Sequence, residues 1–461
     1  MPGYVRARKD ANGKIKKRAD GSTIWQARWR PADDPGDIRR EEKNFKTKGE
    51  GQRWIRKRDA DVERGAYAPA SKGAVLFSTV ADELRAVWIA RGLEPKTRAG
   101  YEAILDRWLI GEADPLHPGR PTRFRSVKIG AVTTKMAQDF MGEVGAARAP
   151  NTARRIFGVL SDVMKLAAQR GYIAATPCAA VELPSKKRAG VRRSHLYLEG
   201  PELLKLADAI PAHWRLPVLV AGSCGLRAGE LWALRRRDVD FLHKELTVRY
   251  ALKEINSSAA SLAEDKGLIV GPPKSAASRR RVSIPAELLP LLQAHIEQPG
   301  VRGPGGYAVA RAVDEDRADL GWTDNASDTD RLLFVTPVVL PKDETKQLRG
   351  GYPVRHNLFY KRVFRPTIEG NADNDIAPAL PARLQRLRWH DLRHTCAALS
   401  LSTPGANLAT VKERLGHENI ATTVDLYGKR VPSVDAALAD AVGASIFAPP
   451  KVVPLRPAVQ S

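Results

Sequence analysis

The stretch LGHENIATTVDLYG, residues 415–428, places a histidine and a tyrosine at a defined spacing. His417 follows one glycine, and Tyr427 lies ten residues later, directly before another. An imidazole donates hydrogen bonds and accepts protons near neutral pH. A phenol becomes a nucleophile when a neighbouring group removes its proton. Alone, such a histidine is usual at a helix cap or in a core, and such a tyrosine is usual as a packed aromatic. The stretch is therefore interpreted together with the segments before it.

Two of those segments carry a cation beside a turn. In AGSCGLRAGEL (221–231), Arg227 follows a glycine bend, and Glu230 lies three residues on, on the same face of a helix. In PPKSAASRRRVSIP (272–285), Lys274 lies in a turn ahead of a strand, where its ammonium can reach outward. Taken singly, Arg227 is typical of a surface or ion-paired arginine, and Lys274 of a solvated loop lysine.

A third segment, WHDLRHT (389–395), groups three basic side chains. Spacings of three and four residues place His390, Arg393 and His394 on one face of a helix. Arginine binds phosphate oxygens through a planar, two-toothed fork that lysine lacks. The segment therefore predicts a site for an anion.

The net charge points to the same kind of partner. Lysine and arginine number 75 against 52 aspartates and glutamates, which gives +23 over 461 residues. An excess of this size favours a polyanion, nucleic acid first and an anionic membrane surface second. The length exceeds one compact core, so about two to four domains are expected.

Cysteine usage and hydropathy narrow the class further. Cys178, Cys224 and Cys396 are widely spaced and form no CxxC pair, which argues against a disulfide framework or a cysteine-rich zinc site. Cys224 and Cys396 lie in apolar runs and are expected to be buried. No apolar run reaches the roughly 18 residues of a membrane span, and no secretion signal is found. We expect a cytoplasmic protein.

Residues 1–70 are expected to form a small basic module. Turn signals at 10–13 and 20–22 separate short segments, and alternating apolar residues predict a strand between Thr23 and Arg30. A third candidate strand runs from Arg39 to Phe45, and Lys48 to Gly65 is expected to be helical. Three strands and a helix with so many cations favour DNA binding, for which we name Arg28 and Arg30. The alternative is a solvated basic extension.

Residues 75–185 are expected to form a helical domain. A helix capped by Ser78 or Thr79 opens it. Three more are predicted over 97–109, 132–144 and 152–168. Three arginines gather at the start of the last helix, where exposed N–H groups favour phosphate: Arg148, Arg154 and Arg155.

A basic connector, 185–193, leads to a C-terminal domain over 194–447. Its Lys186, Lys187 and Arg188 are further candidate DNA contacts. The domain is expected to open with helices at 200–209 and 217–225, to include strands at 246–250 and 281–284, and to continue mostly as helices. Residues 297–330, rich in Gly and Asp, are expected to be a surface insertion, and the Pro-rich tail 448–461 is expected to be disordered.

Taken together, these segments resemble the Arg…Lys…His-x-x-Arg…His…Tyr pattern of tyrosine recombinases, in the same order along the chain. The Leu-Gly-His…Thr-Thr-x-x-x-Tyr-Gly stretch is the most specific part. The layout also resembles that of phage integrases. This resemblance implies a multidomain fold: a small N-terminal α+β arm-type DNA-binding domain, an all-α core-binding (SAM-like) domain, and a mostly helical α+β tyrosine recombinase catalytic domain.

The resemblance implies a role for each residue of the pattern. Arg227 and Arg393 would grip the non-bridging oxygens of a phosphodiester, and Tyr427 would attack its phosphorus. His390 would accept the phenolic proton, Lys274 would protonate the leaving 5′-oxygen, and His417 would donate a hydrogen bond. Glu230 and His394 would support them. No metal or other cofactor is expected, because the arginines supply the positive charge.

The implied partners are double-stranded attachment-site DNA and three further copies of the chain. A homotetramer on DNA would recombine two duplexes through a Holliday junction, with accessory DNA-bending or directionality factors as further candidates, in the cytoplasm of a bacterial host. No membrane is involved. An apolar stripe after Ser433 would dock on a neighbouring protomer, or would pack within its own chain.

Three other classes of protein share part of this pattern. A DNA-binding repressor could keep this fold without catalysis, but Tyr427 and both arginines are present. A zinc metalloprotease could use His390 and His394 with His417 or Glu418, but aspartate replaces the expected glutamate between the histidines. A type IB topoisomerase shares the chemistry but lacks the modular N-terminal half.

Overall fold

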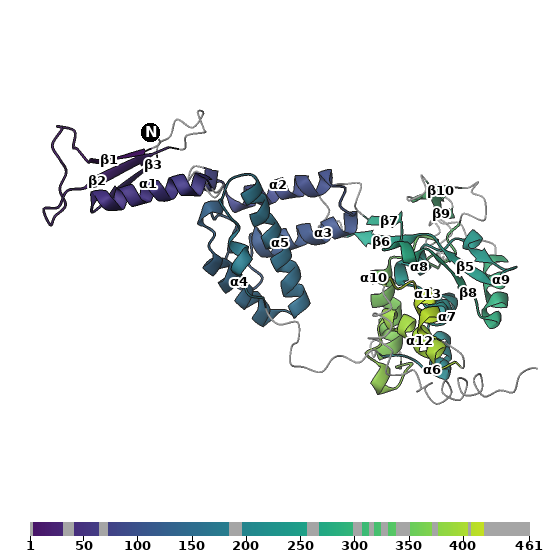
Figure 1. The fold of residues 1–461 in the computed structure, drawn as a ribbon. Coiled ribbons are helices and arrows are strands. Elements are labelled where there is room, and N and C mark those ends of the chain that lie inside the picture. The colour runs from purple at the N-terminus through teal and green to yellow at the C-terminus, as the bar shows by residue number, and fades with distance from the viewer. Residues whose placement is uncertain are drawn as a thin grey trace, which may run out of the picture. The chain divides into compact units, whose positions relative to one another are not determined.

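The computed structural model divides into two compact units, an N-terminal one up to residue 190 and one formed by the rest of the chain (Figure 1). Their boundary falls inside the predicted connector 185–193. Of residues 307–312 and 318–323 only the backbone is described. The structure describes residues 3–30, 41–63, 72–183, 196–255, 267–297, 307–312, 318–323, 331–337, 351–370, 377–403 and 407–418.

The N-terminal module is a three-stranded antiparallel sheet with one helix. The sheet order is β1 (Gly3–Ala7), β2 (Trp25–Trp29) and β3 (Glu41–Phe45), and α1 (Lys48–Glu63) packs against it. The alternation of β2 predicted its two faces correctly, because Ala27 and Trp29 are buried. Trp29 also donates a hydrogen bond to Asp59 of α1 at 2.6 Å. The predicted three strands and helix are confirmed.

The helical block of the first unit has an apolar core. Val80 and Leu84 of α2, Phe140 of α4, and Ile156 and Leu160 of α5 are buried in it. The predicted helices are present with shifted ends. The helices are α2 (Phe77–Ala90), α3 (Pro95–Ile104), α4 (Thr134–Ala147) and α5 (Pro150–Gln169), and a π-helical turn (Leu105–Leu109) continues α3.

Two predicted helix starts were wrong. Neither Ser78 nor Thr79 caps α2, which begins at Phe77; the Phe77 N–H donates to the carbonyl of Val127 at 2.8 Å instead. The last helix begins at Pro150, two residues before its predicted start, because proline at the first helical position needs no N–H partner. In both cases the first residue of the helix needs no capping side chain, because its N–H binds a distant carbonyl in α2 and is missing from proline in α5.

The second unit is mostly helical, with two small sheets. The helices predicted at 200–209 and 217–225 are confirmed. The helices are α6 (Gly200–Ala209), α7 (Arg215–Cys224), α8 (Ala228–Trp232), α9 (Leu289–Glu297), α10 (His356–Phe359), α11 (Arg365–Glu369), α12 (Trp389–Leu401) and α13 (Leu408–Leu415). Across all described residues, no helix is long and apolar enough to cross a membrane.

The first of these sheets carries the strands predicted at 246–250 and 281–284. Its order is β4 (Val239–Asp240), β5 (Glu245–Val248) and β8 (Arg280–Ser283). In β8, Arg280 and Val282 share one face and pair with Val248 and Leu246 of β5. The strand therefore turns Arg280 toward the interior of the unit, with Val282.

The second sheet shows that the predicted surface insertion contains strands. Its order is β6 (Ala251–Ile255), β7 (Gly267–Gly271), β10 (Ala318–Thr323) and β9 (Tyr307–Ala312), all antiparallel. The insertion thus adds a hairpin to the hairpin that precedes Lys274. Glycine and aspartate composition alone did not reveal the attachment of this hairpin to β7, because Ala318 of β10 pairs with Val270, about fifty residues upstream.

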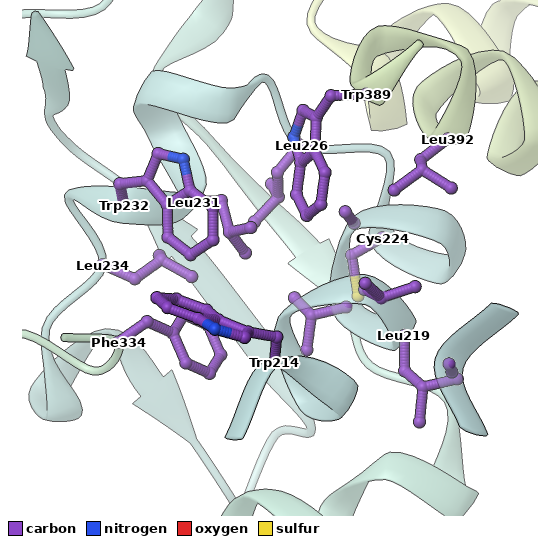
Figure 2. Close-up of a cluster of buried hydrophobic side chains, with 14 of the residues drawn as sticks. Trp214, Leu219, Cys224, Leu226, Leu231, Trp232, Leu234, Phe334, Trp389 and Leu392 are labelled. Atoms are coloured by element: carbon purple, nitrogen blue, oxygen red, sulfur yellow. The ribbon is translucent and has the colours of Figure 1, made fainter. Parts of the chain in front are cut away.

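An aromatic cluster fixes α8 against α12 (Figure 2). Trp232, the last residue of α8, stacks on Trp389, the first residue of α12, with ring centroids 5.5 Å apart. Trp214 meets Trp232 edge-on at 6.0 Å. The cluster therefore joins the helix that follows Arg227 to the helix that carries Arg393.

Cys224 and Cys396 are buried, as predicted, and burial raises the pKa of Cys224 to about 11.

Candidate functional site

The bend between α7 and α8 positions Arg227. Gly225 ends α7 in the left-handed conformation, with φ at 68°. A Cβ there would lie 2.7 Å from the Leu415 side chain, so only glycine fits. Arg227 then precedes α8, and its backbone N–H donates to Glu230 Oε2 at 3.0 Å. The glycine bend expected from the sequence is present.

Glu230 is a buried carboxylate between two guanidiniums. Its Oε1 accepts from Arg227 Nη1 at 2.7 Å, and its Oε2 accepts from Arg280 Nη2 at 3.1 Å. Burial alone would raise the pKa of Glu230, but Arg280 and Arg227 outweigh it and hold the pKa below its ordinary value. Glu230 is therefore ionised and orients both arginines, consistent with the support role predicted for it.

Arg393 is buried on α12, with only 2% of its surface exposed. Its Nη1 donates to the Gly225 carbonyl at 2.7 Å, and its Nη2 donates to the Leu415 carbonyl. It thus ties the glycine bend of α7 to the end of α13. The site brings Arg227 and Arg393 together although 166 residues separate them in the sequence.

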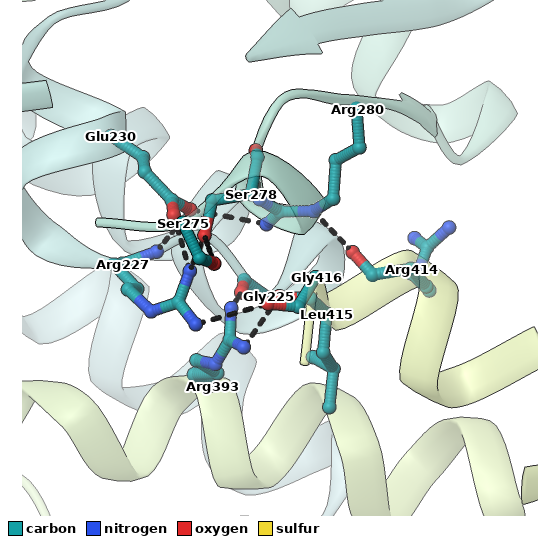
Figure 3. Close-up of polar contacts among 10 residues, drawn as sticks. All are labelled: Gly225, Arg227, Glu230, Ser275, Ser278, Arg280, Arg393, Arg414, Leu415 and Gly416. Carbon is teal, nitrogen blue, oxygen red and sulfur yellow. Dashed lines mark hydrogen bonds and ion pairs between the residues drawn. The ribbon is translucent and has the colours of Figure 1, made fainter. Parts of the chain in front are cut away.

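The C-terminus of α13 is the meeting point of the site (Figure 3). Arg227 Nη2 donates to the Gly416 carbonyl at 3.1 Å, and Arg227 Nη1 also donates to Ser278 Oγ at 2.7 Å. Gly416 has φ at 63°, and a Cβ would lie 2.8 Å from the Ala277 carbonyl oxygen. Both the conformation and the space require glycine, and His417 follows directly.

His417 is half-buried beside several cations. The pKa of His417 is lowered to about 4, mostly by burial. Four neighbouring groups lower it further, in decreasing order of effect: Arg393, Arg227, His390 and Arg280. The imidazole is therefore neutral at pH 7. In that form it has one N–H to donate, which suits hydrogen bonding to a phosphate oxygen.

His390 and His394 lie on the same face of α12, as the spacing predicted. Their ring centroids are 5.1 Å apart and the rings meet edge-on. His390 is exposed, and His394 is buried. Their different exposure suits the predicted division between a proton acceptor and a supporting residue.

Two further predicted positions need separate mention. Lys274 lies in an exposed turn after β7, four residues before Ser278, whose hydroxyl binds Arg227. Tyr427 lies outside the described residues, as do Lys186, Lys187 and Arg188.

The predicted DNA contacts in the first unit differ in their surroundings. Arg28 pairs with Glu42 at 2.5 Å on the sheet face opposite α1, and Arg30 is exposed at the end of β2. At the start of α5, Arg155 is exposed and Arg154 is partly buried. The Arg148 guanidinium lies over the Trp108 ring, 5.2 Å from its centroid.

Sequence interpretation missed Arg280. Within the run Arg279-Arg280-Arg281 it resembled a solvated cation, yet its side chain is 6% exposed. The alternation of β8 could have identified it, because Val282 is two residues on and buried. Its exposed neighbours line a surface cavity of about 520 Å³ together with Arg249.

The zinc alternative lacks a donor set. Across the described residues, which include His390, His394, His417 and Glu418, no three His, Cys, Asp or Glu side chains are grouped so that they could hold a metal ion. His417 instead lies beside the guanidiniums of Arg393, Arg227 and Arg280, which repel a cation.

Comparison with known proteins identifies relatives. The model of the Phage integrase family matches residues 339–431, a range that contains His390, Arg393, His417 and Tyr427. A prophage phiRv2 integrase of Mycobacterium tuberculosis is 27% identical over 409 residues, 88% of each chain. The ICEBs1 integrase of Bacillus subtilis is 27% identical over 321 residues, 69% of this chain and 72% of that one.

A solved structure shares the fold. The Tn1549 transposon integrase, in complex with a circular intermediate DNA, superposes with a TM-score of 0.53 at 17% identity. The match covers 80% of this chain and 99% of that one. At this identity the likeness concerns the arrangement of the elements.

Proposed function

This chain belongs to the phage integrase family of tyrosine recombinases, and we propose that it cuts and rejoins DNA through a covalent bond between Tyr427 and a 3′-phosphate. It is a site-specific DNA recombinase of a phage or another mobile element. The observation that carries the proposed mechanism is the convergence of Arg227 and Arg393 at the end of α13, beside His417. Tyr427 follows eleven residues after Gly416.

The proposed reaction begins with a phosphodiester held by Arg227 and Arg393. Attack by the Tyr427 oxygen places more negative charge on the non-bridging oxygens, and guanidiniums in a partly buried site stabilise that charge best. The neutral His417 adds a hydrogen bond. The protein acceptors that hold both arginines support this role, because such stabilisation requires donors that are already in position.

Proton transfer completes the step. His390, exposed on α12, takes the phenolic proton, and Lys274 gives a proton to the departing 5′-oxygen. The phosphorus–O5′ bond breaks as the phosphorus–tyrosine bond forms. A 5′-hydroxyl of the partner duplex then attacks the phosphotyrosine and restores the phenol. Because the ester bond energy is retained, the reaction consumes no nucleotide.

We assign DNA binding to the basic parts of the first unit. The start of α5, with Arg148, Arg154 and Arg155, would hold the core site, and the module of residues 1–70 would bind arm sites through Arg28 and Arg30. Four protomers would assemble on two duplexes and pass through a Holliday junction, inside the host cell. The net charge of +23 supports a partner with many phosphates.

The test compares covalent adduct formation by the native protein and by Tyr427→Phe on the attachment site of the mobile element. That site is found by sequencing the DNA that flanks the gene. A nicked suicide duplex should trap the native protein as an adduct that resists SDS, and the variant should form none. Affinity for DNA should stay within about twofold, because one hydroxyl is lost and binding depends mostly on the cations. An adduct with the variant would assign the nucleophile elsewhere. The native reaction should also continue in EDTA.

A further inference from the structure

Arg280 lies outside the six residues of the recombinase pattern, yet it contacts both the end of α13 and Glu230 of α8. Its Nε donates to the Arg414 carbonyl at 2.7 Å, its Nη1 to the Ser278 carbonyl at 3.0 Å, and its Nη2 to Glu230 at 3.1 Å. We propose that Arg280 is a positioning residue that holds Arg227 and His417 in register for catalysis. The inference rests on the proposed function.

The first contact belongs to a series. Three successive carbonyls end α13, those of Arg414, Leu415 and Gly416, and they accept from Arg280, Arg393 and Arg227 in turn (Figure 3). The last carbonyls of a helix have no partner within the helix and carry partial negative charge. Each is met here by a guanidinium. Arg280 holds the first of these three carbonyls, and so fixes the position of the backbone that leads from Arg414 to His417.

The second contact acts on Arg227 through Glu230. Arg280 occupies Oε2 of that carboxylate, and Arg227 occupies Oε1. Glu230 is 2% exposed, so its rotamer is set by these partners rather than by water. Without Arg280, one oxygen of a buried carboxylate would lose its cation, and Arg227 would follow the carboxylate as it rearranged.

Burial separates this role from direct contact with DNA. The Arg280 side chain is 6% exposed, and its three kinds of nitrogen all donate to protein acceptors. Its strand neighbour Arg281 is 71% exposed. A duplex would therefore meet Arg281, whereas Arg280 acts only through the groups that it holds.

Arg235 of the same unit provides a matched control. It too is buried, with its Nε 3.5 Å from Asp238 and its guanidinium 4.7 Å from the Tyr250 ring centroid. Replacing either arginine with glutamine removes a buried guanidinium and leaves a carboxylate. The two substitutions should therefore lower the melting temperature similarly, but only the change at Arg280 disturbs groups that hold Arg227 and His417.

The experiment measures adduct formation at saturating DNA, the Kd for DNA, and the melting temperature. Arg280→Gln should react about a hundredfold more slowly, since a displacement near 1 Å has that effect, with Kd within about twofold. Arg280→Lys should recover little, because one ammonium cannot reach three acceptors in different directions. Arg235→Gln should react at the native rate when each protein is held equally far below its own melting temperature.

A second readout does not depend on the nucleophile. In an NMR titration, with His417→Asn to assign the signal, the pKa of His417 should rise in Arg280→Gln and stay unchanged in Arg235→Gln. Removing a nearby cation has this sign.

Several results would overturn the proposal. Equal rates for Arg280→Gln and Arg235→Gln would reduce Arg280 to a stabilising residue, as would failure of both Arg280 variants to fold while Arg235→Gln folds. A parallel rise in Kd would make it a DNA contact. If the native protein formed no adduct, the proposed function would fail instead, and the titration would still test the position of Arg280.

Discussion

Arginines gather at opposite ends of two helices, one in each unit. At the start of α5, Arg154 and Arg155 lie where the helix already has partial positive charge. At the end of α13, Arg227, Arg280 and Arg393 donate to carbonyls with partial negative charge. The second group is satisfied within the protein. In the first group Arg155 is exposed, so the contrast separates arginines that are held by protein acceptors from arginines that are proposed to bind a polyanion.

The largest effect should come from replacing the guanidinium of Arg393. Arg393→Lys keeps the charge but cannot reach Gly225 and Leu415 together. Adduct formation at saturating DNA should fall about a thousandfold, the upper range for losing one donor to a developing oxyanion. The Kd for DNA should change little. If rate and affinity fell together, the α13 arginines would belong with those at α5, and the contrast would disappear.

A glycine comparison should give the next largest effect. Gly416→Ala forces a side chain into a left-handed conformation against the Ala277 carbonyl, and should lower the free energy of unfolding by about 1–3 kcal/mol. Gly158→Ala in α5 is the control: its Cβ would meet nothing within 4 Å. It should be neutral or stabilise by up to about 1 kcal/mol. Urea denaturation of both variants measures the difference. Equal losses would mean that the end of α13 is no more constrained than α5.

At α5 the effect should appear in affinity alone. Arg155→Gln should weaken DNA binding several-fold and reduce the slope of log Kd against log salt by about one phosphate contact. The rate at saturating DNA should match that of the native protein. A salt titration by fluorescence anisotropy measures the slope. An unchanged slope would remove Arg155 from the DNA contacts.

The smallest effect should be a pH dependence near α13. The pKa of His417 is about 4 in the folded protein, against about 6.5 in the unfolded chain. Above the higher value both states are neutral. As pH falls between the two, the unfolded chain binds the proton first, so the free energy of unfolding decreases. Urea midpoints at about pH 7.5 and about pH 5 should differ less in His417→Asn than in the native protein. Identical differences would indicate that His417 titrates normally.

The sequence predicted elements better than it predicted their neighbours. Periodicity located β2 and α12 because their burial follows directly from local alternation and spacing. The family pattern named Arg227 and Arg393, and the structure brings them together. The starts of α2 and α5 were missed because a distant carbonyl and a proline replaced the capping side chains. Likewise the pairing of β10 with β7 was missed because the two strands lie far apart in the sequence.

Arg280 shows the limit most clearly. Its neighbours in the sequence are exposed arginines, and composition gives all three the same interpretation. What distinguishes Arg280 is a carbonyl 134 residues downstream and a carboxylate 50 residues upstream. No local pattern encodes such partners, although strand alternation does indicate that the side chain faces inward.

The end of α13, held by three arginines, would also set the local concentration of the proposed nucleophile. Tyr427 lies eleven residues beyond Gly416, and a chain spans at most about 3.6 Å per residue, so the phenol stays within about 40 Å of that anchor. One phenol in such a sphere corresponds to a concentration on the order of millimolar. Inserting residues between Gly416 and Tyr427 would dilute the phenol while leaving the arginines at the end of α13 in place, so the reaction rate and the proposed phosphate binding could be tuned independently.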